Sequence, residues 1–161
     1  MEFIRVRRGD SELIERVYSI LAAAGAYMVE TMGLMHWATP YSRERITEDT
    51  EGKQVYIVRS DDAFVATFTL SDKTTYAFRG TPDEGAAYLS KFAVAPGIMK
   101  SGIGSACIGY IESVCRREGK TKLRFDVYAK SEHAINFYVK MGYTEVASPD
   151  ATIICMEKAL K

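Results

Sequence analysis

Residues 99–112, MKSGIGSACIGYIE, carry two glycines directly ahead of a run with helical spacing. The apolar positions that set this spacing are Ile103, Cys107, Ile111 and Val114. They predict that Gly102 and Gly104 lie in the first turn of a helix. The first N–H groups of a helix have no acceptor within it, and glycine lets a ligand approach them closely. The stretch is therefore a candidate anion site, for which phosphate is the usual ligand. A tight turn that binds nothing is the alternative interpretation.

Two familiar phosphate-binding patterns do not fit this stretch. The chain contains no GxxxxGK[ST] string, which the P-loop requires. The dinucleotide fingerprint GxGxxG fails because Cys107 stands at its third glycine. These checks disfavour a nucleotide-binding protein.

The segments on either side alternate between strand and helix patterns. Strands are expected at residues 3–7, 54–59, 63–70, 86–94, 123–127, 144–147 and 152–158. Helices are expected from Asp10 or Ser11 as far as Met35 (with a break or bend at Gly25), at 42–49, after Gly102, and at about 134–141. Ser131 is expected to cap the last helix and Gly142 to end it. The order βααβββαβαββ predicts one α/β domain, residues 1–161, with a mixed sheet.

Composition narrows the class of protein. The 161 residues are 47% hydrophobic, which is enough for a packed core, and the formal net charge is zero. A neutral chain has no general attraction to nucleic acid or to an anionic membrane, and no apolar run is long enough to span one. Three cysteines, two histidines and no CxxC argue against disulfides and a metal site, so we expect free thiols and a cytoplasmic location.

Three segments together resemble the GNAT family of N-acetyltransferases. MKSGIG at residues 99–104 corresponds to the family's acyl-CoA loop, [Gln/Arg]-x-x-Gly-x-[Gly/Ala]. LSKFAVAP at residues 89–96 resembles the family's fourth strand, and AINFYVKMGY at 134–143 resembles its later helix. The order of elements matches over nearly the whole chain. The resemblance implies a single-domain GNAT-like fold with a mixed, mostly antiparallel sheet flanked by helices.

The resemblance also implies acetyl-CoA as acyl donor, with no metal. The expected phosphate-binding residues are Met99, Lys100, Ser101, Gly102, Ile103, Gly104 and Ser105. The backbone of Phe92 and Val94 would hold the pantetheine arm, and Asn136 either touches the cofactor or faces solvent. Met99 departs from the family's Arg or Gln, and Ser131 from its frequent Asn. Because Met99 cannot donate a hydrogen bond, one polar contact near the pyrophosphate is expected to be missing.

The implied reaction moves an acetyl group to a primary amine by direct attack on the thioester. Tyr138 corresponds to the family's general acid for the leaving thiolate, although its place on an apolar helix stripe also suits a core residue. A lysine-like amine is mostly protonated at pH 7, which is a handicap of roughly 4–5 kcal/mol. A base or a water chain must therefore deprotonate the amine. The candidate bases are Glu30, His36, Asp83, Glu84 and Tyr88, among which the sequence does not choose.

The acceptor is expected to be a small molecule or a peptide. In the family the first helices line the acceptor pocket, which here implies residues 25–41, rich in Met and aromatic residues. Candidate substrate-binding residues are Glu30, His36, Trp37 and Tyr88. Most of these residues equally suit a helix packed on the sheet. A non-catalytic acyl-CoA-binding or regulatory module is the alternative function, and a homodimer is possible.

Overall fold

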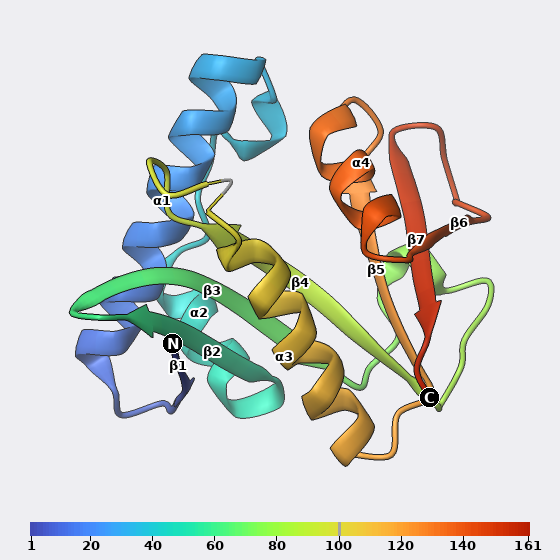
Figure 1. Ribbon diagram of the computed structural model, residues 1–161, viewed down its shortest axis with the longest axis horizontal. Coiled ribbons are helices and arrows are strands. Elements are labelled where there is room, and N and C mark those ends of the chain that lie inside the picture. The colour runs from blue at the N-terminus through green and yellow to red at the C-terminus, as the bar shows by residue number, and fades with distance from the viewer. Residues whose placement is uncertain (100) are drawn as a thin grey trace. The chain divides into compact units, whose positions relative to one another are not determined.

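The computed structural model describes residues 1–99 and 101–161 (Figure 1). Its elements are β1 (Glu2–Val6), α1 (Ser11–Met32), the 3-10 turn η1 (Met35–Trp37), α2 (Arg43–Gly52), β2 (Gln54–Ser60), β3 (Ala63–Ser71), the 3-10 turn η2 (Tyr76–Phe78), β4 (Ala86–Val94), α3 (Ile103–Arg117), β5 (Lys122–Tyr128), α4 (Glu132–Lys140), β6 (Thr144–Val146) and β7 (Ile153–Ala159). The order confirms the predicted βααβββαβαββ arrangement.

The strands form one sheet of seven in the order β1-β2-β3-β4-β5-β7-β6. β4 and β5 pair in parallel, whereas β1 with β2, β2 with β3, β5 with β7 and β6 with β7 pair antiparallel. This confirms the expected mixed, mostly antiparallel sheet flanked by helices.

The parallel pair β4–β5 is short. In the described part of the chain it aligns only Ala86–Tyr88 of β4 with Lys122–Arg124 of β5. Both strands continue beyond this point, β4 by six residues and β5 by four. The later residues of β4 therefore have backbone groups that β5 does not pair.

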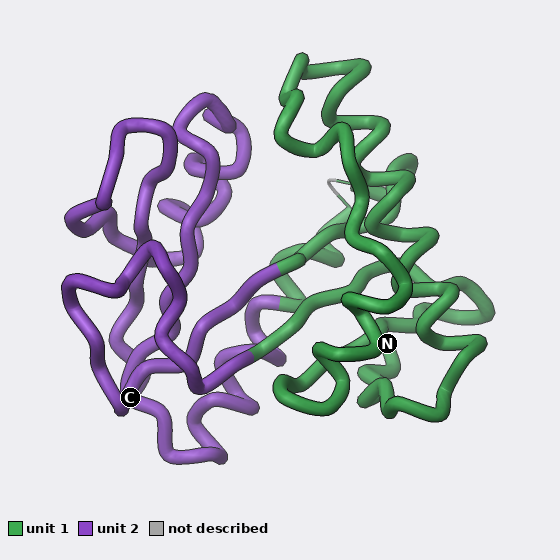
Figure 2. The backbone as a smooth tube through the Cα atoms, turned by 180° about the vertical axis from the view of Figure 1, so that it is seen from behind, with its two compact units in different colours: residues 1–70, 91–107 green, residues 71–90, 108–161 purple. Residues whose placement is uncertain are grey.

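The chain folds into two compact units (Figure 2). Unit 1 comprises residues 1–70 and 91–107, and unit 2 comprises residues 71–90 and 108–161. In unit 1, α1 and α2 pack on β1, β2 and β4 through a cluster of buried apolar residues. That cluster consists of Val6, Ile14, Val17, Ile20, Leu21, Ala24, Ile46, Val55, Ile57 and Ala93. In unit 2, η2 packs on β4 and β7 through Ala77, Phe78, Ala86, Tyr88 and Cys155.

Helix α1 differs from the prediction at two places. It runs through Gly25 without a break, because Gly25 serves packing: a Cβ there would stand 2.6 Å from the backbone oxygen of Trp37. It ends at Met32 rather than Met35, because Gly33 adopts φ +64° and turns the chain into η1. Helix α2 continues to Gly52, three residues beyond the predicted end.

The helix caps differ in whether the side chain takes part. Ser42 caps α2, since its hydroxyl accepts a hydrogen bond from the N–H of Arg45 at 3.2 Å. Ser131 occupies the N-cap position of α4 as predicted, and Asp10 that of α1, but neither side chain accepts a capping hydrogen bond. The Asp10 carboxylate instead accepts from the N–H of Arg7. Gly142 follows α4 with φ +94° and ends the helix as predicted.

Cys107, Cys115 and Cys155 are free thiols buried in the structure, as expected. Burial raises the pKa of Cys107 to about 12 and that of Cys115 to about 11, so both thiols stay protonated and unreactive at neutral pH. Among the described residues, we find no helix with the length and apolarity needed to cross a membrane.

Candidate active site

The glycine segment forms the N-terminal entrance to α3. Gly102 precedes the helix with φ +87°, a backbone conformation that L side chains rarely adopt. Its C=O accepts the N–H of Ala106 at 3.1 Å. The preceding N–H groups of Ile103, Gly104 and Ser105 therefore lie in the first turn, where helix geometry supplies no acceptor. A Cβ on Gly102 would meet no atom within 4 Å, so this face of the backbone is open.

The chain leading into the helix is a pair of tight turns. Gly97 has φ +90°, and the N–H of Ser101 donates to the C=O of Ile98 at 3.3 Å. The Ser101 hydroxyl donates to the same carbonyl, so this side chain stabilises the turn. Ser101 and Ser105 are exposed, whereas Met99, Ile103 and Gly104 are half-buried. Lys100 lies outside the described residues.

Strand β4 leads into this loop and carries the predicted pantetheine-binding backbone. Phe92 and Val94 are half-buried, and Ala93 between them is buried against α1 and α2. The N–H of Ala95, just past the strand, donates to the C=O of Val65 on β3 at 2.8 Å. One edge of this segment is thus tied to β3, while its other edge lies beyond the pairing with β5.

Tyr138 lies on α4 inside an aromatic cluster of unit 2. Its ring centroid is 4.3 Å from that of Phe125 on β5, 5.1 Å from Phe137 and 6.0 Å from Tyr143. Only 8% of the residue is exposed, and burial raises the pKa of its phenol well above the ordinary value. Asn136, two residues earlier on the same helix, is exposed.

A buried charge network supports that cluster. The Glu112 carboxylate on α3 accepts from the Tyr143 hydroxyl at 2.9 Å and from the Lys158 ammonium of β7 at 2.8 Å. The Lys158 ammonium also donates to the C=O of Met141, at the end of α4, at 3.0 Å. Tyr143 stacks at a tilt on Phe125, 4.9 Å between centroids. The network therefore joins α3, β7 and the end of α4 beside the aromatic cluster that contains Tyr138.

The candidate bases fall into different environments. Tyr88 is 1% exposed and its hydroxyl lies 3.4 Å from both the Thr74 hydroxyl and the Arg124 guanidinium, so it belongs to the core of unit 2. Hydrogen bonds from Lys122 and the N–H of Gly85 hold the pKa of Asp83 below its ordinary value, which weakens it as a base. Glu84, the next residue, is exposed.

The expected acceptor residues all belong to unit 1, apart from Tyr88. Glu30 is exposed near the end of α1, and His36 is exposed in η1, where partial burial lowers its pKa. The His36 and Trp37 rings lie 5.8 Å apart. His36 and Trp37, which are consecutive in the chain, thus lie in η1 of unit 1, while Tyr88 lies in the core of unit 2.

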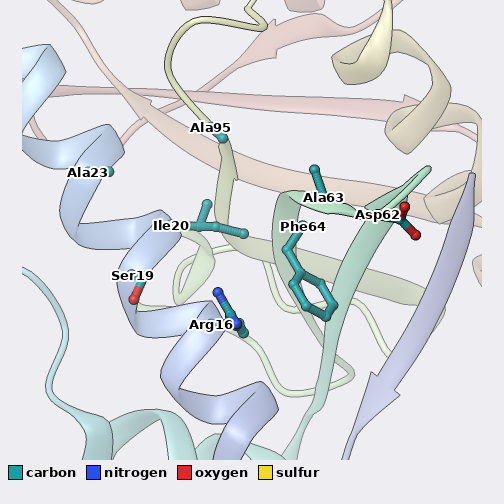
Figure 3. Close-up of a pocket in the computed structure, with 8 residues that line it drawn as sticks. All are labelled: Arg16, Ser19, Ile20, Ala23, Asp62, Ala63, Phe64 and Ala95. Atoms are coloured by element: carbon teal, nitrogen blue, oxygen red, sulfur yellow. The ribbon is translucent and has the colours of Figure 1, made fainter.

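Unit 1 also contains a pocket of about 350 Å³ that sequence reasoning did not find (Figure 3). Residues of α1, of the β2–β3 turn, of β3 and the residue after β4 line it: Arg16, Ser19, Ile20, Ala23, Asp62, Ala63, Phe64 and Ala95. The Arg16 guanidinium lies 5.5 Å from the centre of the Phe64 ring. No predicted site residue is among those that line it.

Sequence reasoning missed three groups that the structure singles out. Lys91 is the first: it follows Ser90, and these two are the polar residues of the strand AAYLSKFAV. Asp126 on β5 is the second, because desolvation of its carboxyl group raises the pKa although the residue as a whole is exposed. The third is the Glu112–Lys158 pair, whose partners are 46 residues apart and give no local signal.

No group of three or more His, Cys, Asp or Glu side chains in the described part of the chain could hold a metal ion.

The profile of the acetyltransferase (GNAT) family matches residues 14–143. An uncharacterised N-acetyltransferase, YesJ of Bacillus subtilis, is 28% identical over 113 residues, which are 66% of this chain and 61% of that protein. The chain thus spans about six tenths of the length of that relative.

Solved structures share the fold at low identity. The ribosomal-protein-S18-alanine N-acetyltransferase of Escherichia coli aligns with a TM-score of 0.73 and 17% identity, over 99% of this chain and 94% of that one. The PaiA N-acetyltransferase of Thermoplasma acidophilum, solved in complex with coenzyme A, aligns with a TM-score of 0.76 and 15% identity over 99% of both chains.

Proposed function

This chain is a member of the GNAT acetyltransferase family, and we propose that it transfers an acetyl group from acetyl-CoA to a primary amine by direct attack of the amine on the thioester. The observation that carries the proposal is the backbone at Gly102. Its positive φ and open face are what a diphosphate needs at a helix N-terminus, because a side chain there would occupy the space of the ligand. The residues present therefore fit coenzyme A.

Two parts of the chain would hold the donor. The N–H groups of Ile103, Gly104 and Ser105 would bind the diphosphate at the positive end of α3. Met99 supplies no polar contact, so these backbone groups carry most of the affinity. The unpaired edge of β4 at Phe92 and Val94 would hydrogen-bond the amides of the pantetheine arm.

Acetyl-CoA supplies an activated acyl group whose carbonyl oxygen gains negative charge as the amine attacks. A backbone N–H on the unpaired edge of β4, at Phe92 or Val94, would stabilise that charge. The departing sulfur needs a hydrogen bond or a proton, for which we propose the Tyr138 hydroxyl. Because burial raises the pKa of Tyr138, the phenol stays protonated over the working pH range and acts as a hydrogen-bond donor.

The amine must lose its proton before it attacks. Of the carboxyl groups considered above, Asp83 has its pKa lowered and Asp126 has its pKa raised. A raised pKa makes a stronger base, so Asp126 joins Glu30, His36 and Glu84 as a candidate, while Tyr88 is buried in the core of unit 2. Residues of α1 and η1, with Trp37 as an aromatic wall, would contact the acceptor.

The proposal is tested first by the binding of acetyl-CoA and then by its turnover with amines. A ligand at 100 times its dissociation constant stabilises a protein by about 2.7 kcal/mol. Acetyl-CoA is therefore expected to raise the melting temperature, and ATP is not. Thiol release is then measured against a panel of amines that contains polyamines, aminoglycosides and peptides with free N-termini. Binding without release on any amine would favour the non-catalytic module, and stabilisation by ATP in place of acetyl-CoA would contradict the proposal.

A further inference from the structure

Lys91 has an unusual backbone conformation for its place in the fold. Its φ is +52°, although it lies inside β4 and is a long-chain residue. The other non-glycine residue with positive φ in the described chain is Asp61, in the tight turn between β2 and β3, where this conformation is common. Within a strand such a conformation bends the chain and persists only where surrounding contacts hold it.

The contacts that hold Lys91 come from α2 and from the segment before it. The Lys91 ammonium lies 2.6 Å from the Asp49 carboxylate and 4.6 Å from the centre of the Tyr41 ring. The Lys91 side chain is 7% exposed and that of Asp49 is 10% exposed. The pair is therefore shielded from water, which makes it much more effective than a surface ion pair at fixing one geometry.

The same carboxylate has a second, weaker partner. Lys53, at the end of α2, places its ammonium 3.6 Å from the other Asp49 oxygen, and its side chain is 36% exposed. Lys53 lies one helical turn from Asp49, and its ion pair stays within this segment instead of reaching β4. It thus offers a matched control: a lysine on the same carboxylate that does not act on the strand.

The bend falls where the proposed reaction needs a precise backbone. Lys91 directly precedes Phe92, and the pairing between β4 and β5 ends at Tyr88. Ala93 is fixed in the apolar cluster on the side of α1 and α2 that Lys91 also reaches. With Lys91 and Ala93 both anchored on one face, the orientation of the Phe92 peptide between them is determined.

We propose that the Lys91–Asp49 ion pair holds the bend in β4 and so aims the Phe92 N–H at the carbonyl oxygen of the bound thioester. Lys91 and Asp49 are then positioning residues, and neither touches the reacting atoms. This inference rests on the proposed function, because it assigns a task to the backbone that binds the acyl donor. It predicts an effect on recognition of the carbonyl group that a merely stabilising ion pair would not have.

The readout is the ratio of two dissociation constants, measured by calorimetry. The ligands are acetyl-CoA and S-ethyl-CoA, a thioether that lacks the carbonyl oxygen. One hydrogen bond to that oxygen corresponds to a preference of about two- to tenfold for acetyl-CoA in the wild-type protein. In Lys91→Met and in Asp49→Asn the preference is expected to fall to about one, while S-ethyl-CoA binds within about threefold of wild type. In both variants kcat falls at least tenfold with a smaller change in KM for the amine.

Lys53→Met is the control and is expected to keep the preference and kcat. If Lys91→Met fails to fold, Asp49→Asn decides alone, because it keeps the shape of the side chain and removes its charge. A folded variant that retains both the preference and kcat would overturn the inference, since the pair would then be structural only. If the wild-type protein does not bind acetyl-CoA, the proposed function itself fails and this inference falls with it. If the wild-type protein binds acetyl-CoA and turns over but the variants behave like it, the proposed function stands and only the inference about the ion pair is overturned.

Discussion

Replacing Gly102 with alanine tests the central geometry of the site. At φ +87° an alanine is strained, and an L residue in this region costs roughly 1–2 kcal/mol. No atom lies within 4 Å of the added Cβ, so the backbone alone causes this cost. Gly109 is the matched control, because it lies inside α3 with equally open space and no positive φ. There alanine removes a flexible residue from a helix and is expected to stabilise by about 0.5–1 kcal/mol.

The two alanine variants are thus expected to differ by about 2 kcal/mol, Gly102→Ala being the less stable. For a chain of this size that is a difference of about 4–8 °C in melting temperature. Urea denaturation gives the free energies, and calorimetry gives the affinity for coenzyme A. Gly102→Ala is expected to bind coenzyme A at least tenfold more weakly, a loss of about 1.4 kcal/mol, whereas Gly109→Ala binds as wild type does. Equal stability of the two variants would refute the strain argument, and wild-type affinity in Gly102→Ala would refute the phosphate site.

Three further predictions concern side chains in unit 2 and on α3. Tyr138→Phe is expected to keep its affinity for acetyl-CoA within a few-fold while kcat in the thiol-release assay falls at least tenfold; unchanged kcat would remove the phenol from the reaction. Lys158→Met leaves the Glu112 carboxylate buried with a weaker partner, so the free energy of unfolding in urea should fall by roughly 3 kcal/mol, against almost no change for exposed Lys140→Met. Burial raises the pKa of Cys107 from 9.0 to about 12. Between these values the unfolded chain loses the thiol proton first, so stability falls as pH rises. Near pH 10–11 the free energy of unfolding of the wild-type protein should fall with pH more steeply than that of Cys107→Ala, by about 1.4 kcal/mol per pH unit. Equal slopes in the two proteins would contradict this prediction.

The sequence predicts most of the fold because the elements have strong local signals. Hydrophobic periodicity and turn residues located every strand and helix in order, with ends mostly within one or two residues. Gly142 was predicted correctly because a helix C-terminus needs a residue that accepts positive φ. Gly25 was misjudged because its role depends on the backbone of Trp37, twelve residues away, and periodicity carries no information about such a contact.

The residues of the candidate site also differ in how far the sequence predicts them, according to whether their contacts are local or distant in the chain. The loop at Gly102 could be predicted, since a motif within one short segment forms it. The surroundings of Tyr138 could not, because its neighbour Tyr143 is held by Glu112, which pairs with Lys158, and these three residues lie far apart in the chain. The bend at Lys91 escaped prediction for a related reason. A left-handed lysine within a strand contradicts local preference, and only the contact with Asp49, 42 residues earlier, accounts for it.

The position of β7 has a consequence for synthesis of the protein. β7 is the last strand in the chain, yet it lies between β5 and β6 and pairs with both. On the ribosome, β5 and β6 therefore emerge before the strand that joins them exists. The nascent chain must keep one edge of β5 open until Ile153–Ala159 leaves the exit tunnel. Stalled or prematurely terminated chains would display that edge and a Glu112 that lacks its Lys158 partner, a state suited to capture by chaperones.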